Sequence, residues 1–143
     1  MVGELFINNE DARKTYGIIF GEDSLTALMT PPPVKPYIEN KSALVHGKQV
    51  LNDEDNPPKL DERDVQLTFY LHAKNREQFL ERYQKFTTML QKGKVDIRTK
   101  YQPGTTYHCL YISCAQFSQF NGRLAKFVLK LNEPNPKDRG KND

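Results

Sequence analysis

Histidine and cysteine are the side chains in this sequence best suited to metal binding or nucleophilic catalysis, and they are few. The 143 residues include three histidines, His46, His72 and His108, and two cysteines, Cys109 and Cys114. No two histidines share the short spacing of metal ligands, and two thiols do not make a zinc site. His108 and Cys109 are neighbours in an expected strand, where adjacent side chains point to opposite faces. We therefore expect no catalytic residue and no metal site.

Phosphate and calcium binding have loop patterns of their own, which this sequence lacks. Gly104 and Gly122 are typical of turns and do not form a phosphate-binding loop. The acidic run Asp53–Asp55 lacks the ligand and glycine spacing of a calcium loop. We expect no cofactor and no small-molecule substrate, and we interpret the chain as a protein that is not an enzyme.

A group of aromatic side chains raises the alternative of single-strand nucleic-acid binding. Tyr101, Tyr107 and Tyr111 recur in an expected strand region, and Arg98 and Lys100 lie close by in the sequence. Aromatic rings beside cations can stack nucleic-acid bases. The basic residues are not interleaved with the aromatic ones, so packing within a sheet is the favoured interpretation, and a β module that binds single strands is kept as the alternative.

Composition places limits on the class of protein. The net charge is +3, from 21 Lys plus Arg against 18 Asp plus Glu, which is too small to indicate a nucleic-acid or membrane partner. No apolar run approaches the roughly 20 residues of a membrane-spanning helix, and residues 1–10 do not resemble a signal peptide. The length suits one domain, predicted over 1–136, with a mobile C-terminal tail over 137–143.

Two segments give the strongest structural patterns. Apolar and polar side chains alternate over Asp64–His72, which predicts a half-buried strand. Asn75 then begins a predicted helix over about 75–92, in which a reciprocal cap with Gln78 is expected and Gly93 ends the helix. Apolar residues on the inward faces of these and a later strand are expected to form the core: Val65, Leu67, Phe69, Phe79, Tyr83, Phe86, Phe127 and Leu129.

The remaining elements are shorter and complete the predicted fold. Strands are expected at 4–7, 18–20, 94–99, 105–113 and 124–131. A single helical turn is expected at 11–15, and 24–29 is compatible with a short helix or a strand. One helix covering a mainly antiparallel sheet gives an α+β fold dominated by β structure, as a β-sandwich or split barrel flanked by one helix.

A long extended arm is predicted between the second strand and the central one, over about 30–61. Pro31, Pro32 and Pro33 exclude regular structure at its start, because proline lacks an amide hydrogen and fixes φ. An extended segment can pack on its own domain or pair with the edge of a neighbouring subunit. We favour the neighbour, and the expected subunit-interface residues are Pro32, Val34, Tyr37, Ile38, Leu44, Val45, Val50 and Leu51.

The order of these elements resembles the N-terminal domain of the distal tail proteins of long-tailed bacteriophages, including prophage-encoded copies. The likeness is one of order and spacing along nearly the whole chain. Four stretches carry it: Ile7 to Ile18, Asp61 to Asn75, Gly93 to Tyr111, and Gly122 to Pro136.

The resemblance implies a structural role in a phage tail. It implies a fold related to tail-tube subunits and self-association into a hexameric ring between the tail tube and the host-recognition tip. The partners would be copies of the chain and other tail proteins, and the location would be the virion tail after synthesis in the bacterial cytoplasm. Many distal tail proteins carry a second, carbohydrate-binding-like domain, which we do not expect in these 143 residues. Another tail-tube or tube-completion subunit is therefore an alternative.

Overall fold

The computed structural model describes residues 3–35, 39–41, 48–50 and 57–140. Three helices and nine strands are formed by these residues. In chain order they are β1 (Leu5–Ile7), β2 (Glu10–Asp11), α1 (Ala12–Tyr16), β3 (Ile18–Phe20), α2 (Ser24–Met29), β4 (Glu39–Lys41), β5 (Lys48–Val50), β6 (Arg63–His72), α3 (Arg76–Gln91), β7 (Lys94–Thr99), β8 (Tyr107–Phe120) and β9 (Leu124–Glu133).

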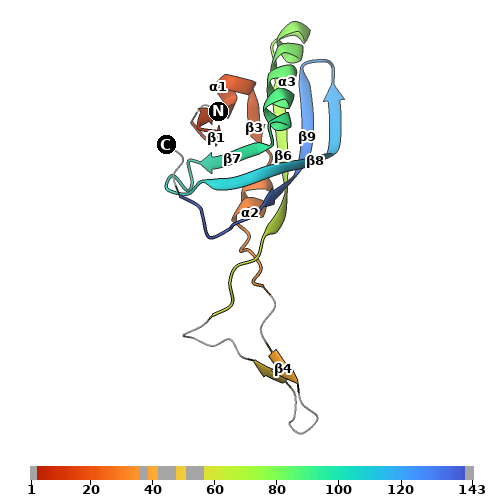
Figure 1. Cartoon of the computed structure of the whole chain (residues 1–143). Helices are drawn as coiled ribbons and strands as arrows, with labels where there is room; N and C mark the ends of the chain where they lie inside the picture. The colour runs from red at the N-terminus through yellow and green to blue at the C-terminus, as the bar shows by residue number, and fades with distance from the viewer. Residues whose placement is uncertain (1–2, 36–38, 42–47, 51–56, 141–143) are drawn as a thin grey trace.

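Seven of the strands form one antiparallel sheet in the order β2-β1-β7-β8-β9-β6-β3, and β4 pairs with β5 apart from it (Figure 1). The sheet is not closed into a barrel. The predicted α+β class with dominant β structure is confirmed. Where one flanking helix was expected, α3 is joined by two short helices, α1 and α2. Within the described residues, no helix combines the length and the hydrophobicity that crossing a bilayer requires.

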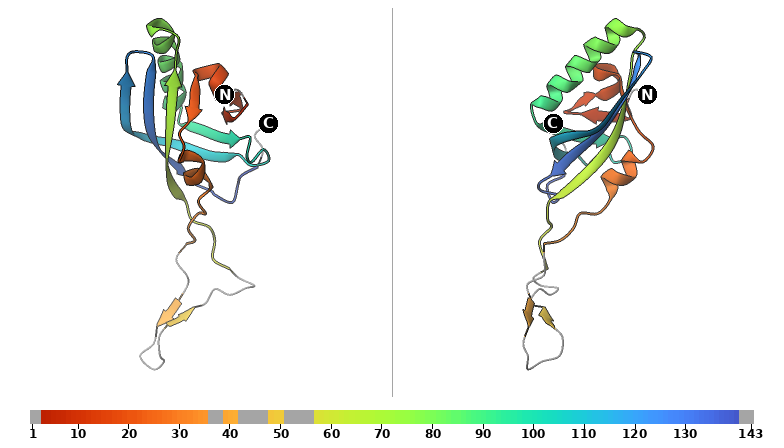
Figure 2. Two further views of the ribbon diagram at one scale, coloured as in Figure 1. Left: turned by 180° about the vertical axis from the view of Figure 1, so that it is seen from behind. Right: turned by 90° about the vertical axis from the view of Figure 1, so that its right-hand side faces the viewer.

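The centre of the sheet is the pairing of β6 with β9, which runs from Arg63 opposite Glu133 to His72 opposite Leu124. Helix α3 covers one face of the sheet (Figure 2), and alternate residues of both strands are buried. The alternation follows from the pleat of a strand, which turns successive side chains to opposite faces. Of the eight expected core residues, seven are buried and Tyr83 is partly buried against the same cluster.

Helix α3 begins and packs as its sequence pattern predicts. Asn75 Oδ1 accepts a hydrogen bond from the Gln78 amide at 2.8 Å. Gln78 Oε1 accepts from the amide of Lys74 at 2.7 Å, so the reciprocal half of the cap lies one residue earlier than predicted. The ring of Phe86 is fully buried and meets the rings of Tyr16 and Phe127 edge to face. Helix α3 is therefore fixed to the sheet by aromatic packing.

Helix α2 protects part of an exposed sheet edge. Strand β3 pairs with β6 only as far as Phe20, opposite Phe69. Beyond it, Gly21 N donates to Thr68 O, and Ser24 Oγ accepts from Thr68 N and donates to Thr68 O, each at 2.8 Å. These bonds satisfy backbone groups that an edge would otherwise leave open. The segment 24–29, which the sequence left undecided, is thus a helix docked on β6.

Gly17 closes α1 in a left-handed conformation with φ of 69°. A Cβ at this position would lie 2.6 Å from the backbone oxygen of His72, which the β6 ladder holds in place. We expect Gly17→Ala to destabilise the protein by about 2 to 3 kcal/mol, because it adds backbone strain and a steric clash. Urea unfolding would measure the change.

Gly104→Ala is the matched control for that experiment. No atom lies within 4 Å of a Cβ built on Gly104, and its φ is not in the left-handed region. We expect a change within about 0.5 kcal/mol. Equal destabilisation by both substitutions would contradict the conformational argument for Gly17.

Candidate functional site

The arm leaves the sheet as two backbone segments that pair with each other. Val34 forms an isolated antiparallel bridge with Leu60. Lys35 N donates to Lys59 O, and Asp61 N donates to Pro33 O, both at 2.8 Å. Farther out, β4 and β5 pair in an antiparallel hairpin that stands away from the sheet in every view (Figures 1 and 2). The predicted extended arm is therefore a two-stranded projection where it is described.

The residues expected at a subunit interface are only partly within the described structure. Pro32 is half-buried and Val34 is exposed, and both lie at the root of the arm. Val50 ends β5. The others lie outside the described residues: Tyr37, Ile38, Leu44, Val45 and Leu51. Their role in assembly stays a prediction.

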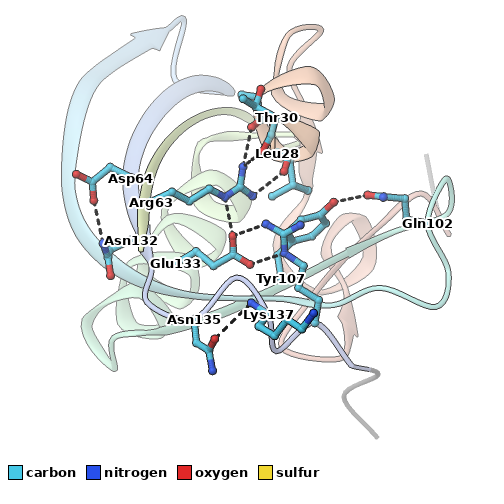
Figure 3. Close-up of polar contacts among 12 residues, drawn as sticks. Leu28, Thr30, Arg63, Asp64, Gln102, Tyr107, Asn132, Glu133, Asn135 and Lys137 are labelled. Carbon is cyan, nitrogen blue, oxygen red and sulfur yellow. Dashed lines mark hydrogen bonds and ion pairs between the residues drawn. The ribbon is translucent and has the colours of Figure 1, made fainter. Parts of the chain in front are cut away.

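At the root of the arm, Arg63 holds the end of α2. The guanidinium of Arg63 donates to the backbone oxygens of Leu28 and Thr30, each at 2.6 Å (Figure 3). A cation at a helix C-terminus satisfies carbonyls that have no partner within the helix. The arm departs after α2 and returns just before Arg63, so this side chain ties the outgoing segment to the returning one.

Glu133 joins two arginines in the interior beside this root. It is fully buried, and its carboxylate accepts from Arg63 Nε at 2.6 Å. The same carboxylate accepts two hydrogen bonds from Arg139, through Nε and Nη2, each at 2.8 Å. We call Arg63, Glu133 and Arg139 the root cluster. Burial alone would raise the pKa of Glu133, but the hydrogen bonds from Arg139 and Arg63 outweigh it and lower the pKa.

Tyr107 forms the floor of the root cluster. The guanidinium carbons of Arg63 and Arg139 lie 5.6 Å and 4.7 Å from the centroid of its ring, within the range of cation–π contact. Its hydroxyl donates to Gln102 Oε1 at 2.6 Å (Figure 3). The cluster is therefore held between the sheet and the β7–β8 connection.

Sequence reasoning missed the root cluster, although its pattern was present. Arg63 continues the inward row of β6 by one step beyond Val65, and Glu133 continues the inward row of β9 beyond Leu131. Opposite charges at matching ends of two inward rows indicate a buried cross-strand pair. Arg139 lies in the segment 137–143, which was predicted to be a mobile tail. No pattern in the sequence indicated that it would contact Glu133.

Within the described residues, the histidines are not gathered into a metal site. His46 lies outside the described residues. His108 Nδ1 lies 3.1 Å from Asp96 Oδ1, and Lys94 Nζ lies 3.3 Å from Asp96 Oδ2. Burial and the nearby positive charges lower the pKa of His72. Across the part of the chain that the structure describes, no three histidine, cysteine or acidic side chains come together as metal ligands.

The two cysteines occupy different environments, although they do not lie on opposite faces as predicted. Tyr111, two residues after Cys109, is opposite Leu131, and Cys114 is opposite Leu129 in the same inward row, because the register shift after Tyr111 reverses the alternation. Cys109 is buried and Cys114 is exposed, and neither forms a disulfide. Burial raises the pKa of the Cys109 thiol to about 12, so it is protonated at neutral pH and poorly suited to nucleophilic attack.

The tyrosines proposed as a base-stacking surface are separated in the fold. Tyr101 is exposed, Tyr111 is half-buried, and Tyr107 is buried beneath the root cluster. A buried ring has no free face for a base, so this arrangement disfavours stacking on a row of three tyrosines.

Comparison with known proteins identifies a similar fold. No protein-family model and no curated protein matches the chain. Among solved structures, the fold is similar to that of the Dit protein of phage SPP1, described as a paradigm of the hub adsorption apparatus in phages that infect Gram-positive bacteria. The TM-score is 0.63 at 14% identity, over 93% of this chain and 50% of that chain. The chain thus spans about half the length of that protein, and the likeness is one of fold.

Proposed function

We propose that this chain is a structural subunit of the tail of a long-tailed phage or prophage, and that it forms a ring at the junction of tail tube and tip. The observation that carries the proposal is the similarity of nearly the whole chain to a phage hub protein. Its work is mechanical, through repeated contacts between copies. Its location is the virion tail, after synthesis in the bacterial cytoplasm.

One open sheet edge suited to contact between copies lies on the outer half of β8. The ladder between β7 and β8 ends where Tyr111 N donates to Gly93 O. From Ile112 to Phe120, β8 pairs with β9 on one side, and no other described strand pairs with its outer edge. The whole strand contains no aspartate, glutamate, lysine or arginine. A long edge without charges is unusual for a monomer, which commonly uses charged residues to prevent edge pairing.

Apolar side chains are concentrated on the same strand. Four large hydrophobic residues of β8 are at least 45% exposed: Leu110, Ile112, Phe117 and Phe120. Each such residue gains free energy when a partner removes it from water. The strand therefore offers both unpaired backbone groups and apolar side chains to an adjacent subunit.

A ring of head-to-tail contacts needs a second open edge, and among the described strands β3 has one. The strands β8, β9, β6 and β3 form an antiparallel band, and within the described residues no strand pairs with the outer edge of β3. Strand β3, Ile18–Phe20, is also uncharged. Because the band has an even number of strands, β8 of one copy and β3 of the next would be antiparallel when the copies are related by rotation. Such head-to-tail contacts produce a closed ring when the rotation closes.

The arm supplies a second contact in this proposal. Its described parts project from the body, and we propose that the arm meets a neighbouring subunit by adding to an edge or filling a pocket. A hexameric ring follows from the resemblance to distal tail proteins. A different ring size, or a place within the tube, would assign the chain to the tail-tube or tube-completion subunits.

Purified particles test the proposal directly. Particles produced by the genome that encodes the chain should contain it, and cryo-electron microscopy should place it in a ring where tube meets tip. A ring elsewhere in the tail would favour the alternative subunits. Its absence from purified particles would overturn the structural role.

A charge on the open edge is expected to prevent ring formation. Ile112→Lys would place an ammonium group at a side chain that is 54% exposed, so the monomer should keep its fold while the edge resists burial. We expect rings to be lost from the variant particles or reduced at least tenfold, as counted by electron microscopy.

Tyr101→Lys is the control for this substitution. Tyr101 is 61% exposed and lies in the connection before β8, away from the open edge. The substitution Tyr101→Lys adds the same charge to the surface and should leave ring formation unchanged. Rings formed equally well by both variants would exclude the β8 edge from the interface.

A further inference from the structure

The chain turns back on itself after β9 and returns to the root of the arm. Asp138 N donates to Asn135 O at 3.0 Å. Lys137 N donates to Asn135 Oδ1 at 3.3 Å (Figure 3). This turn brings Arg139 back to Glu133, from which it is separated by six positions. We call residues 137–140 the exit strap.

The exit strap is anchored by backbone as well as by side chain. Thr106 N donates to Arg139 O at 3.2 Å, and Thr106 is buried. The side chain of Arg139 covers the ring of Tyr107 and remains 23% exposed. Arg139 is the most exposed member of the root cluster, since the side chains of Arg63 and Glu133 are 6% and 0% exposed.

A continuous series of direct contacts joins the exit strap to the arm. Arg139 binds Glu133, Glu133 binds Arg63, and Arg63 binds the last carbonyls of α2, including that of Thr30. Thr30 is the residue at which the arm begins. A change at one end therefore acts on groups that touch the other end.

Removal of Arg139 would change the charge balance around Glu133. The carboxylate would lose two of its three arginine hydrogen bonds while remaining inside the protein. A buried carboxylate that loses partners must admit water or shift toward those that remain. Arg63 is the remaining partner, and its movement toward Glu133 would weaken its bonds to Leu28 and Thr30.

We propose that the exit strap is a latch on the arm, and that its docking through Arg139 sets how firmly the root of the arm is held. Any partner or adjoining segment that draws the strap away loosens the arm at the same time. The coupling is reciprocal, so fixing the arm in a contact with another subunit strengthens docking of the strap.

Hydrogen exchange on the full chain tests this latch. The reporters are the amides of Lys35 and Asp61, which form the bonds across the root of the arm. In Arg139→Gln, we expect both amides to exchange at least about fivefold faster than in the wild type. Asp138→Asn removes an exposed charge from the same strap and should leave both rates unchanged.

Two further variants separate the latch from a general loss of stability. Gly17→Ala destabilises the fold at a distant position and should leave the two rates unchanged relative to the wild type. In a Glu133→Gln background, Arg139→Gln should have no further effect, because the carboxylate that transmits it is gone. Unchanged rates in Arg139→Gln would overturn the proposal. An equal acceleration in Asp138→Asn would also overturn it, as would an undiminished effect of Arg139→Gln in the Glu133→Gln background.

Discussion

Replacing Phe86 by alanine is expected to destabilise the protein by about 3 to 5 kcal/mol, the range for truncating a buried phenylalanine. Phe86 is fully buried on α3, and its ring centroid lies 5.2 Å from that of Phe127 and 6.2 Å from that of Phe69. The substitution would leave a cavity among aromatic rings that belong to three different elements. Thermal unfolding should show a fall in melting temperature of roughly 10 °C or more.

Two other substitutions on α3 test the cause of that loss. Phe86→Leu keeps much of the volume and should cost about 1.5 kcal/mol or less. Leu80→Ala truncates a side chain of the same helix that is 56% exposed, and the effect should stay within about 0.5 kcal/mol. A shift of only a few degrees in Phe86→Ala would show that α3 does not depend on this residue for its packing.

The parts of the fold that follow from sequence are those with a regular period. Strict alternation identifies β6, and the spacing of four, three and four between Phe79, Tyr83, Phe86 and Leu90 identifies α3. Both patterns arise because one side of the element must face the core. The predicted strand over 94–99 matches β7 at both ends for the same reason.

Strand β8 shows where a regular period fails as a guide. The predicted strand ended at Ser113, whereas β8 continues to Phe120. Register shifts occur between Tyr111 and Ser113 and again between Cys114 and Gln116. Each bulge adds a residue and moves the following side chains to the other face, so the alternation in the sequence is interrupted while the pairing with β9 continues.

Long-range partners are the second limit of sequence reasoning. Arg63 and Glu133 are separated by 70 positions and meet only because β6 pairs with β9 in one register. No local property of either residue specifies that register. The same limit applies to the open edges of β8 and β3, since an edge is defined by the strands that do not pair with it.

The arm and the root cluster belong to one mechanical arrangement. In the proposed ring, an arm in contact with a neighbouring subunit would transmit force to the place where it leaves the domain. That place is held by Arg63 on the carbonyls of α2 and by the bridge between Val34 and Leu60. A buried ion cluster is a costly way to stabilise a fold, because apolar residues of similar volume often do as well. The root cluster lies where the arm leaves the domain. We therefore expect it to fix the direction of the arm more than it increases the free energy of unfolding.

Glu133→Gln is expected to destabilise the protein by about 3 kcal/mol at neutral pH. The substitution keeps the shape of the side chain but leaves Arg63 and Arg139 without their carboxylate, and loss of one partner from a buried ion pair commonly costs about 3 to 5 kcal/mol. Asp64→Asn is the matched control, since Asp64 pairs with Asn132 on the exposed face of the same two strands. It should change the free energy of unfolding by no more than about 0.5 kcal/mol.

The difference in unfolding free energy between wild type and Glu133→Gln should decrease as the pH falls. The pKa of Glu133 is lowered in the folded state from its ordinary value of 4.5. The unfolded chain therefore takes up a proton at a higher pH than the folded one, so the stabilisation by Glu133 is present above about pH 4.5 and is lost as the pH falls through the folded-state pKa. Glutamine does not titrate, so the two unfolding free energies should converge below about pH 4.5. A gap that stayed constant between pH 7 and pH 3 would show that charge on Glu133 is not what holds Arg63 and Arg139 in place.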